Sequence, residues 1–338
     1  MYFVNINEKS TFFYSKEIEA IYAAMSILSE ETKNPYYEKT YGMDFIEHIK
    51  KKYYFLYSLH QQVKFLGLGI IELLVNSKIE NFNLSEFEQQ LLEMDKATLL
   101  FYFWGGDGEI KDFELAVKNE SCIELYDSLT YIKKNVPYLV FEILFLQTER
   151  VIKELITCTN EFQTDNFENE IKSIESFLKA EEEKVRVGLL QKEPLEYSES
   201  LMGKTFKRRG PYKRFYFMPS IYSPYRCVRY MGENQILFYS LNKSNLETKD
   251  IVKILKAISD ETRFSILQLL SNEGPLIGKE IASRLSIATS TLSHHMEQLG
   301  SIGIIHEEKI KNSKYYSVNK LIRKELLDKL TEALGGNK

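Results

Sequence analysis

The sequence predicts a mainly α-helical protein with a minor β component, built from a large N-terminal body and a smaller C-terminal domain. Its length of 338 residues is enough for two or three domains, since one domain usually holds roughly 100–200 residues. Apolar side chains recur at three- and four-residue spacings along most of the chain, which is the period of a helix. One segment departs from that period, because residues 204–241 are rich in aromatic and β-branched side chains.

The N-terminal body, residues 1–203, is expected to be mostly helical. Ile18, Ile21 and Met25 illustrate the spacing that places apolar side chains on one helical face. A glycine-rich run at Gly105–Gly108 is interpreted as a turn. It does not have the context of a phosphate-binding loop, because no strand leads into it and no Gly-Lys-Ser/Thr follows.

Proline residues mark further boundaries in this body. Pro35 follows an asparagine and predicts a loop. Pro137 suits the first turn of a long helix that we expect to run to about Thr157, because proline already has the backbone angle of a helix and needs no amide donor there.

Residues 204–241 are expected to form a small β element that closes the N-terminal domain. Runs such as Phe215–Phe217 and Ile236–Tyr239 have the composition of short strands. The polar run Asn242–Asn245 is interpreted as a linker to the next domain.

The C-terminal domain, residues 249–334, opens with two predicted helices. Ile251 and Ile254 lie on one face of the first helix. Asp260 is expected to cap the second helix, since an aspartate oxygen accepts hydrogen bonds from the unpaired amides of a first turn. Phe264, Leu267 and Leu270 are expected to face inward.

Two further helices with a tight connection follow. A short helix carries Ile281 and Leu285 on its buried face, Ser286–Ala288 forms the connection, and a second helix runs from about Thr289 to Ile302. Gly303 suits the left-handed cap that ends many helices. Two helices joined by so short a turn have helix-turn-helix geometry.

The second of these helices has one apolar and one polar face. Leu292, Met296 and Leu299 occupy the apolar face, whereas Ser293 and His294 lie on the opposite side. Small hydroxyls and an imidazole can approach base edges closely and can donate or accept hydrogen bonds, which is what reading a major groove requires. This pattern predicts a DNA-reading helix.

The remaining residues predict a β-hairpin and a last helix. Residues 304–310 and 314–318 are the expected strands, and their lysines, Lys309, Lys311 and Lys314, suit contacts with phosphates. The last helix carries apolar residues at four-residue spacing, and we expect this row to be able to pack on another subunit: Ile322, Leu326, Leu330 and Leu334.

Charge is distributed unevenly along the chain. The net charge is −4, but residues 1–200 contain 21 basic and 35 acidic side chains, a net charge of −14. Residues 201–230 carry eight basic and no acidic side chains, and residues 241–338 carry 15 basic and 12 acidic ones. An acidic body joined to a basic C-terminal third is typical of a chain in which only that third meets a polyanion.

Two motifs in this domain resemble a known family. The run Leu255–Leu267 resembles the opening of ArsR-type domains, and Ser290–Met296 resembles their recognition helix. The resemblance covers about 85 residues, and a wing-like hairpin follows at the proper place. It implies a dimeric winged helix-turn-helix domain whose paired recognition helices enter successive major grooves of a pseudopalindromic operator.

The residues expected to contact DNA lie on the recognition helix and on the wing. They are Thr289, Ser290, Thr291, Ser293, His294, Gln298, Lys309, Lys311 and Lys314. His295 is closer to the apolar face of the helix, and we expect it to be partly buried.

No metal site, cofactor or catalytic residue is expected. Cys122, Cys158 and Cys227 are widely spaced and form no Cys-x-x-Cys motif, so they are interpreted as reduced, space-filling thiols. Metal-sensing relatives carry cysteines on the short helix before the turn, but here that helix opens with Leu276–Ile281 and has none. The final helix also does not carry the ligand pattern of other metal sensors.

We therefore expect a sequence-specific, DNA-binding transcriptional regulator, which family analogy makes a repressor, with double-stranded DNA and a second copy of the chain as partners. The N-terminal body would sense a small-molecule effector or mediate dimerisation. Two alternatives stay open: an enzyme or ligand-binding protein anchored by the winged helix, and a winged helix that docks protein. His48 and His60 are the only histidines of this body, and no catalytic motif accompanies them.

Other features leave more than one interpretation. The basic stretch Lys204–Arg214 could extend the DNA contact, bind an anion or simply face solvent. The 22 tyrosines and 21 phenylalanines could line a ligand pocket or fill the core. No apolar run reaches the roughly 20 residues that a bilayer requires, and no signal-peptide pattern opens the chain. We expect a soluble, cytoplasmic protein.

Overall fold

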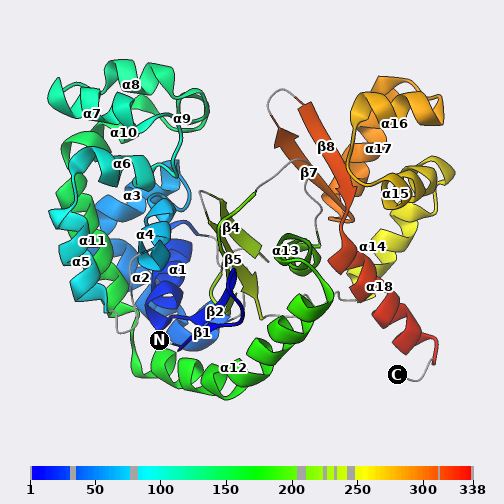
Figure 1. The fold of residues 1–338 in the computed structure, drawn as a ribbon, viewed down its shortest axis with the longest axis horizontal. Helices are drawn as coiled ribbons and strands as arrows, with labels where there is room; N and C mark the ends of the chain where they lie inside the picture. The colour runs from blue at the N-terminus through cyan, green and yellow to red at the C-terminus, as the bar shows by residue number, and fades with distance from the viewer. Residues whose placement is uncertain are drawn as a thin grey trace. The chain divides into compact units, whose positions relative to one another are not determined.

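The computed structural model describes residues 2–30, 36–76, 83–203, 211–223, 227–231, 234–241, 248–310 and 313–335. The chain divides into two compact units (Figure 1). The first contains Met1–Val187 and Tyr212–Leu241, and the second contains Gly188–Pro211 and Asn242–Lys338. The prediction of a mainly helical chain with minor β structure is confirmed.

The first unit is built mostly of helices. They are α1 (Lys16–Leu28), α2 (Tyr36–Lys52), α3 (Tyr54–Gln62), the 3-10 helix η1 (Leu68–Ile70), α4 (Ile71–Asn76), α5 (Leu84–Glu93), α6 (Lys96–Phe103), α7 (Ile110–Lys118), α8 (Ile123–Ser128), α9 (Thr130–Asn135), α10 (Tyr138–Leu146), α11 (Thr148–Glu161) and the start of α12 (Asp165–Gln191). None of the helices in the described ranges is both long and apolar enough to cross a membrane.

A five-stranded sheet completes this unit. Its strands are β1 (Tyr2–Asn5), β2 (Ser10–Tyr14), β3 (Phe215–Ser220), β4 (Cys227–Met231) and β5 (Gln235–Ser240), in the order β1-β2-β3-β5-β4. The three central strands run parallel, with Thr11 opposite Tyr216 and Tyr216 opposite Ile236. The strands after residue 212 were expected, whereas β1 and β2 were not. The side chains of β2 are all buried. Its sequence therefore does not alternate between apolar and polar residues, which is the pattern that predicts a half-buried strand.

A buried carboxylate ties α1 to the sheet. Glu19 is completely buried and accepts hydrogen bonds from Ser220 Oγ at 2.8 Å and from the backbone amides of Ile221 and Tyr222, each at 3.0 Å. Burial raises the pKa of Glu19 to about 7, although these hydrogen bonds act in the opposite direction. The carboxyl group therefore fixes the turn that follows β3.

The helix that was expected from Pro137 to Thr157 is two helices. Pro137 does stand at the N-terminal boundary of α10, but the backbone leaves the helical conformation at Gln147, with φ −116° and ψ 31°. Thr148 donates its side-chain hydroxyl to the Leu144 carbonyl oxygen at 2.6 Å. Such a bond competes with regular helix geometry and accompanies bends.

The second unit contains the predicted C-terminal elements. They are α13 (Pro194–Met202), α14 (Thr248–Ile258), α15 (Glu261–Glu273), β6 (Leu276–Ile277), α16 (Gly278–Leu285), α17 (Thr289–Ser301), β7 (Ile305–Ile310), β8 (Ser313–Val318) and α18 (Lys320–Ala333). The three strands form an antiparallel sheet in the order β6-β8-β7. Helix α13 belongs to this unit, whereas the sequence had placed it with the N-terminal body.

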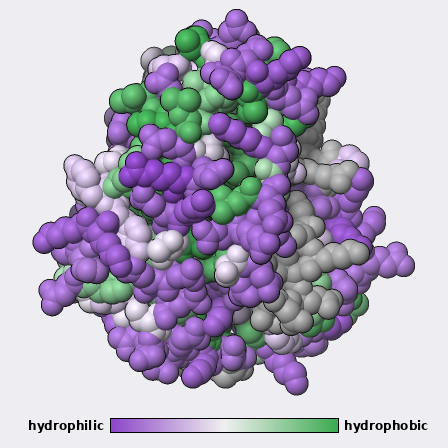
Figure 2. Space-filling model, turned by 90° about the vertical axis from the view of Figure 1, so that its left-hand side faces the viewer, coloured by the Kyte–Doolittle hydropathy of each residue, from purple (hydrophilic) through white to green (hydrophobic). Residues whose placement is uncertain are grey.

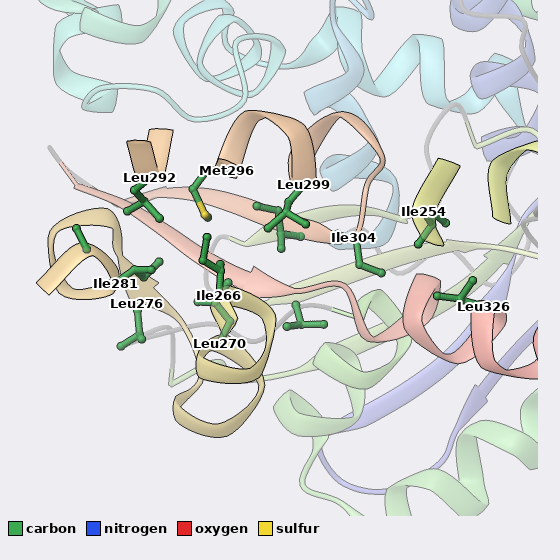
Figure 3. Close-up of a cluster of buried hydrophobic side chains, with 13 residues drawn as sticks. Ile254, Ile266, Leu270, Leu276, Ile281, Leu292, Met296, Leu299, Ile304 and Leu326 are labelled. Atoms are coloured by element: carbon green, nitrogen blue, oxygen red, sulfur yellow. The ribbon is translucent and has the colours of Figure 1, made fainter. Parts of the chain in front are cut away.

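One apolar cluster holds the second unit together (Figure 3). Its members come from α14 to α18 and from the three strands, and they include Ile254, Ile266, Leu270, Leu276, Ile281, Leu292, Met296, Leu299, Ile304 and Leu326. Two expectations about apolar faces are corrected here. Phe264 is 51% exposed, and Ile266 is the buried residue in its place. Ile322 and Leu330 pack on this cluster within their own chain. Most of the apolar row of the last helix, which was expected to be able to pack on another subunit, therefore belongs to the core.

Candidate nucleic-acid interface

The turn between α16 and α17 sets the direction of the predicted reading helix. Ser286 adopts a left-handed conformation, with φ 54° and ψ 40°. The amide of Ile287 then donates to the Ala282 carbonyl oxygen at 3.0 Å, which closes the end of α16. Left-handed backbone is unusual for a residue with a side chain, and it allows the chain to reverse within three residues.

The inner face of α17 anchors this helix on the core. Leu292, Met296 and Leu299 are all buried, and Leu299 is completely so. All three belong to the apolar cluster drawn in Figure 3. The predicted inner face is confirmed, and the opposite face is consequently held outward.

That outer face is polar and exposed near the start of the helix. Thr289, Ser290, Thr291, Ser293 and His294 are all exposed. The N-cap residue is Ala288, whose side chain cannot cap, and the first turn carries no acidic residue. The uncapped amides and the helix dipole therefore present partial positive charge, which suits a phosphate.

Two of the predicted contact residues are held by bonds within the helix. Ser293 donates its hydroxyl to the Thr289 carbonyl oxygen at 2.9 Å, so its oxygen faces outward as an acceptor. Gln298 is only half exposed, and its Nε2 lies 3.0 Å from His294 Nε2.

Arg263 of α15 supports Gln298 from behind. Its guanidinium donates to Gln298 Oε1 and to the backbone carbonyl oxygen of Ala257. Arg263 was not predicted to take part in the site. The sequence does show that Arg263 lies three residues after the cap at Asp260. Its contact with Gln298 depends on how α15 packs against α17, and local sequence does not show such packing.

His295 lies on the inner side of α17, as expected. Its side chain is 13% exposed, and its Nδ1 lies 3.7 Å from a carboxylate oxygen of Asp260. Asp260 caps α15 as predicted, accepting a hydrogen bond from the Arg263 amide at 2.9 Å. That hydrogen bond lowers the pKa of Asp260, and the electrostatic interactions with Arg263 and His295 act in the same direction.

The wing is the hairpin of β7 and β8. Lys314 is exposed and forms an ion pair with Glu307 of the neighbouring strand at 2.7 Å, and this hydrogen bond raises the pKa of Lys314. Lys309 lies in β7 directly opposite Lys314. Lys311 lies outside the described residues.

Further basic residues lie near these elements or in the first unit. Lys279 is exposed in the first turn of α16 and was not predicted as a contact. Of the basic stretch Lys204–Arg214, Lys213 and Arg214 are exposed at the entry to β3, and its other basic residues lie outside the described ranges. Within the described ranges, His, Cys, Asp and Glu side chains do not gather in groups of three that would suit a metal ion.

Two short helices with a tight turn, an outward polar face on the second and a β-hairpin wing define a winged helix-turn-helix domain. Residues 258–308 match the family model described as a helix-turn-helix domain. The chain belongs to the ArsR-type winged helix-turn-helix family of transcriptional regulators.

Three relatives illustrate this membership. A cadmium resistance transcriptional regulatory protein CadC homolog of Staphylococcus aureus is 32% identical over 102 residues, which are 30% of this chain and 84% of the relative. The arsenical resistance operon repressor of the same species is 33% identical over 82 residues, or 24% of this chain and 78% of the relative. The transcriptional repressor SdpR of Bacillus subtilis (strain 168) is 32% identical over 75 residues, or 22% of this chain and 82% of the relative.

Proposed function

We propose that this protein is a sequence-specific transcriptional repressor that binds double-stranded DNA through α17. The observation that carries the proposal is the two-sided character of this helix. Buried Leu292, Met296 and Leu299 fix it on the core, while exposed hydroxyls and an imidazole face outward from an uncapped N-terminus. Two of the relatives above are named as repressors, which supports the sign of the regulation.

The site residues take different roles in this proposal. Ser293 and His294 read base edges in the major groove. Thr289, Ser290 and Thr291 lie at the start of the helix, where hydroxyls and amides suit phosphate oxygens. Lys309, Lys311 and Lys314 reach phosphates from the wing, and Lys279 does so from α16.

We further infer that the DNA-bound form is a homodimer on a pseudopalindromic operator. Exposed apolar side chains support a contact between copies, namely Val252 and Leu255 of α14 and Leu327 of α18, together with Leu334. Large apolar side chains that are exposed to solvent on several elements of a small unit are typical of an association surface.

The first unit is proposed to sense a small molecule. A cavity of about 570 Å³ lies among α5, α6, α10 and α11, which matches the usual size of a ligand pocket. Its apolar lining includes Leu91, Met94 and Leu99, and Lys96 and Arg150 stand among its polar groups. Figure 2 views the side of the molecule that carries α5 and α11, and apolar side chains gather there between hydrophilic ones.

Selection of bound sequences from a random DNA library by the purified chain, followed by footprinting, tests the central proposal. We expect one recurring motif with inverted symmetry and protection of two half-sites. Affinity should fall at least about tenfold between 50 and 200 mM salt, because binding releases condensed counterions. Enrichment of no motif, or affinity that does not change with salt, contradicts DNA reading by α17. A reporter gene placed behind the selected site then measures whether the protein lowers transcription.

A further inference from the structure

Three side chains form a hydrogen-bonded path from the half-buried Arg263 of α15 to the outer face of α17. Arg263 donates to Gln298 Oε1 and is itself held by the Ala257 carbonyl oxygen. Gln298 Nε2 lies 3.0 Å from His294 Nε2. Because His294 is exposed and Gln298 is only half exposed, the path ends at the DNA-facing surface.

The chemistry of these groups fixes the direction of each bond. A guanidinium has donors and no acceptor, so the amide oxygen of Gln298 must face Arg263. The amide nitrogen of Gln298 then faces His294, and an NH₂ group can only donate. His294 Nε2 must therefore accept. A neutral imidazole has one donor and one acceptor nitrogen, so its proton lies on Nδ1.

We propose that the path Arg263–Gln298–His294 locks His294 in its Nδ1–H form and thereby sets the base that this residue reads. The inference rests on the proposed DNA-binding function. A locked Nδ1–H leaves the exposed His294 with a hydrogen-bond donor to offer to a base edge. It matches a guanine, whose N7 and O6 both accept, or a thymine, whose O4 accepts, and it disfavours a cytosine, whose N4 amino group donates. Gln298 is thus a positioning residue for specificity, and it does not itself need to touch a base.

Neighbouring charges leave this assignment unchanged. Asp260 lies beside His295, not beside His294, and the rings of His294 and His295 are 6.1 Å apart. Protonated His294 would direct an Nε2–H at the Gln298 NH₂ group and would add a second positive charge to the path that begins at Arg263.

Nitrogen NMR of the full chain with ¹⁵N-labelled histidine tests the first half of the proposal without DNA. The chain has five histidines, and the His294 signals are identified by their loss in His294→Ala. At pH 8, where an unperturbed histidine is neutral, we expect His294 in the Nδ1–H form. Gln298→Glu should switch it to the Nε2–H form, because a carboxylate accepts from both Arg263 and His294. An Nε2–H form in the unmodified chain, or an unchanged form in Gln298→Glu, overturns the proposal.

Selection of bound DNA by the same variants tests the second half. In Gln298→Glu, His294 presents an acceptor at Nδ1, so the preference at one position per half-site should shift by about tenfold from a base that only accepts, guanine or thymine, toward a base with an amino group. Ser301→Glu adds the same charge to the same helix outside the path and should leave that preference unchanged. Gln298→Met removes the amide without adding charge and should weaken the base preference at that position.

The two readouts separate the two ways of failing. Absence of DNA binding by the unmodified chain overturns the proposed function and the specificity claim together, whatever tautomer is found. A tautomer switch with unchanged base preference in Gln298→Glu overturns the specificity claim alone.

Discussion

At the scale of single residues, α17 separates the residues proposed to read DNA from those that hold the fold together. Ser293 and His294 are exposed on its outer face, whereas Leu292, the residue before Ser293, is buried. A change of an outer residue should therefore alter recognition, and a change of the inner one should alter stability.

We expect Ser293→Ala or His294→Ala to weaken binding to the preferred site by about 1–3 kcal/mol, with little effect on non-specific DNA. Each removes a hydrogen-bonding group that reads a base and leaves the phosphate contacts in place. Titrations against the selected site and a scrambled site measure the two affinities. Leu292→Ala is the control, since it should lower the free energy of unfolding by about 2–5 kcal/mol. Equal losses on both DNAs would contradict the assigned roles.

Glu19 makes the stability of the first unit depend on pH. Its pKa is about 7 in the folded chain and close to 4.3 in an unfolded one. Between these values the folded state holds a proton that the unfolded state releases, so stability is fully present below about pH 4 and is lost as pH rises through 7.

We expect the free energy of unfolding to lose about 3 kcal/mol from this group between pH 4.5 and 8. Glu19→Gln keeps the position uncharged, so the stability of the variant relative to the unmodified chain should rise with pH. Burial lowers the pKa of His60 to about 4, so its contribution to stability rises with pH. This contribution is the same in both proteins and cancels when their free energies of unfolding are subtracted. Fluorescence of Trp104, which is buried and stacked on Phe141 at 5.1 Å, follows the unfolding. A difference that is constant with pH would contradict the assignment.

At the scale of elements, the turn and the wing determine how α17 is presented. The turn places a serine where glycine is normally favoured, since Ser286 has φ 54°. The wing pairs Lys314 with Glu307, so a phosphate must compete with a carboxylate for this ammonium group.

Ser286→Gly should raise the free energy of unfolding of the second unit by about 1 kcal/mol, because glycine adopts left-handed backbone without a side-chain clash. Ser286→Val should lower it, since a β-branched residue is strained there. Thermal unfolding measures both changes, and DNA affinity of the glycine variant should stay the same. A destabilised glycine variant would mean that the serine side chain itself holds the turn.

At the scale of the whole molecule, the division into two units suggests a test of what each contributes. The second unit contains the complete apolar cluster of the winged helix. It also contains α13, which precedes β3, β4 and β5 of the first unit in sequence, and the Lys320 amide donates to the Gly203 carbonyl oxygen at 3.1 Å.

A fragment that starts near Leu246 should therefore recognise the same DNA site as the full chain and lose its response to an effector. Any effector has to bind the DNA-competent and DNA-free states with different affinities to shift their populations. We also expect the fragment to melt earlier than a version with α13 restored, because α18 loses its contacts with that helix. Binding and melting curves of the three proteins measure this. If the fragment is folded and dimeric but does not bind the site, part of the DNA binding belongs to the first unit. Lys213 and Arg214 would then be the first residues to substitute.

The sequence by itself determined the winged helix and the exposed polar face of α17. These depend on local features, namely the cap at Asp260, the helical spacing of Leu292, Met296 and Leu299, and the glycine at position 303, so neighbouring residues were enough to predict them. The helical character of the N-terminal body was predicted for the same reason.

The tertiary structure alone decided which distant residues meet. Pairing of β2 with β3 joins residues about 200 positions apart, and the buried bonds of Glu19 reach equally far. The link from Arg263 to Gln298 depends on how α15 packs against α17, and the exposure of Phe264 depends on which face of α15 the core covers. Such contacts follow from the packing of whole elements, and no local period in the sequence encodes them.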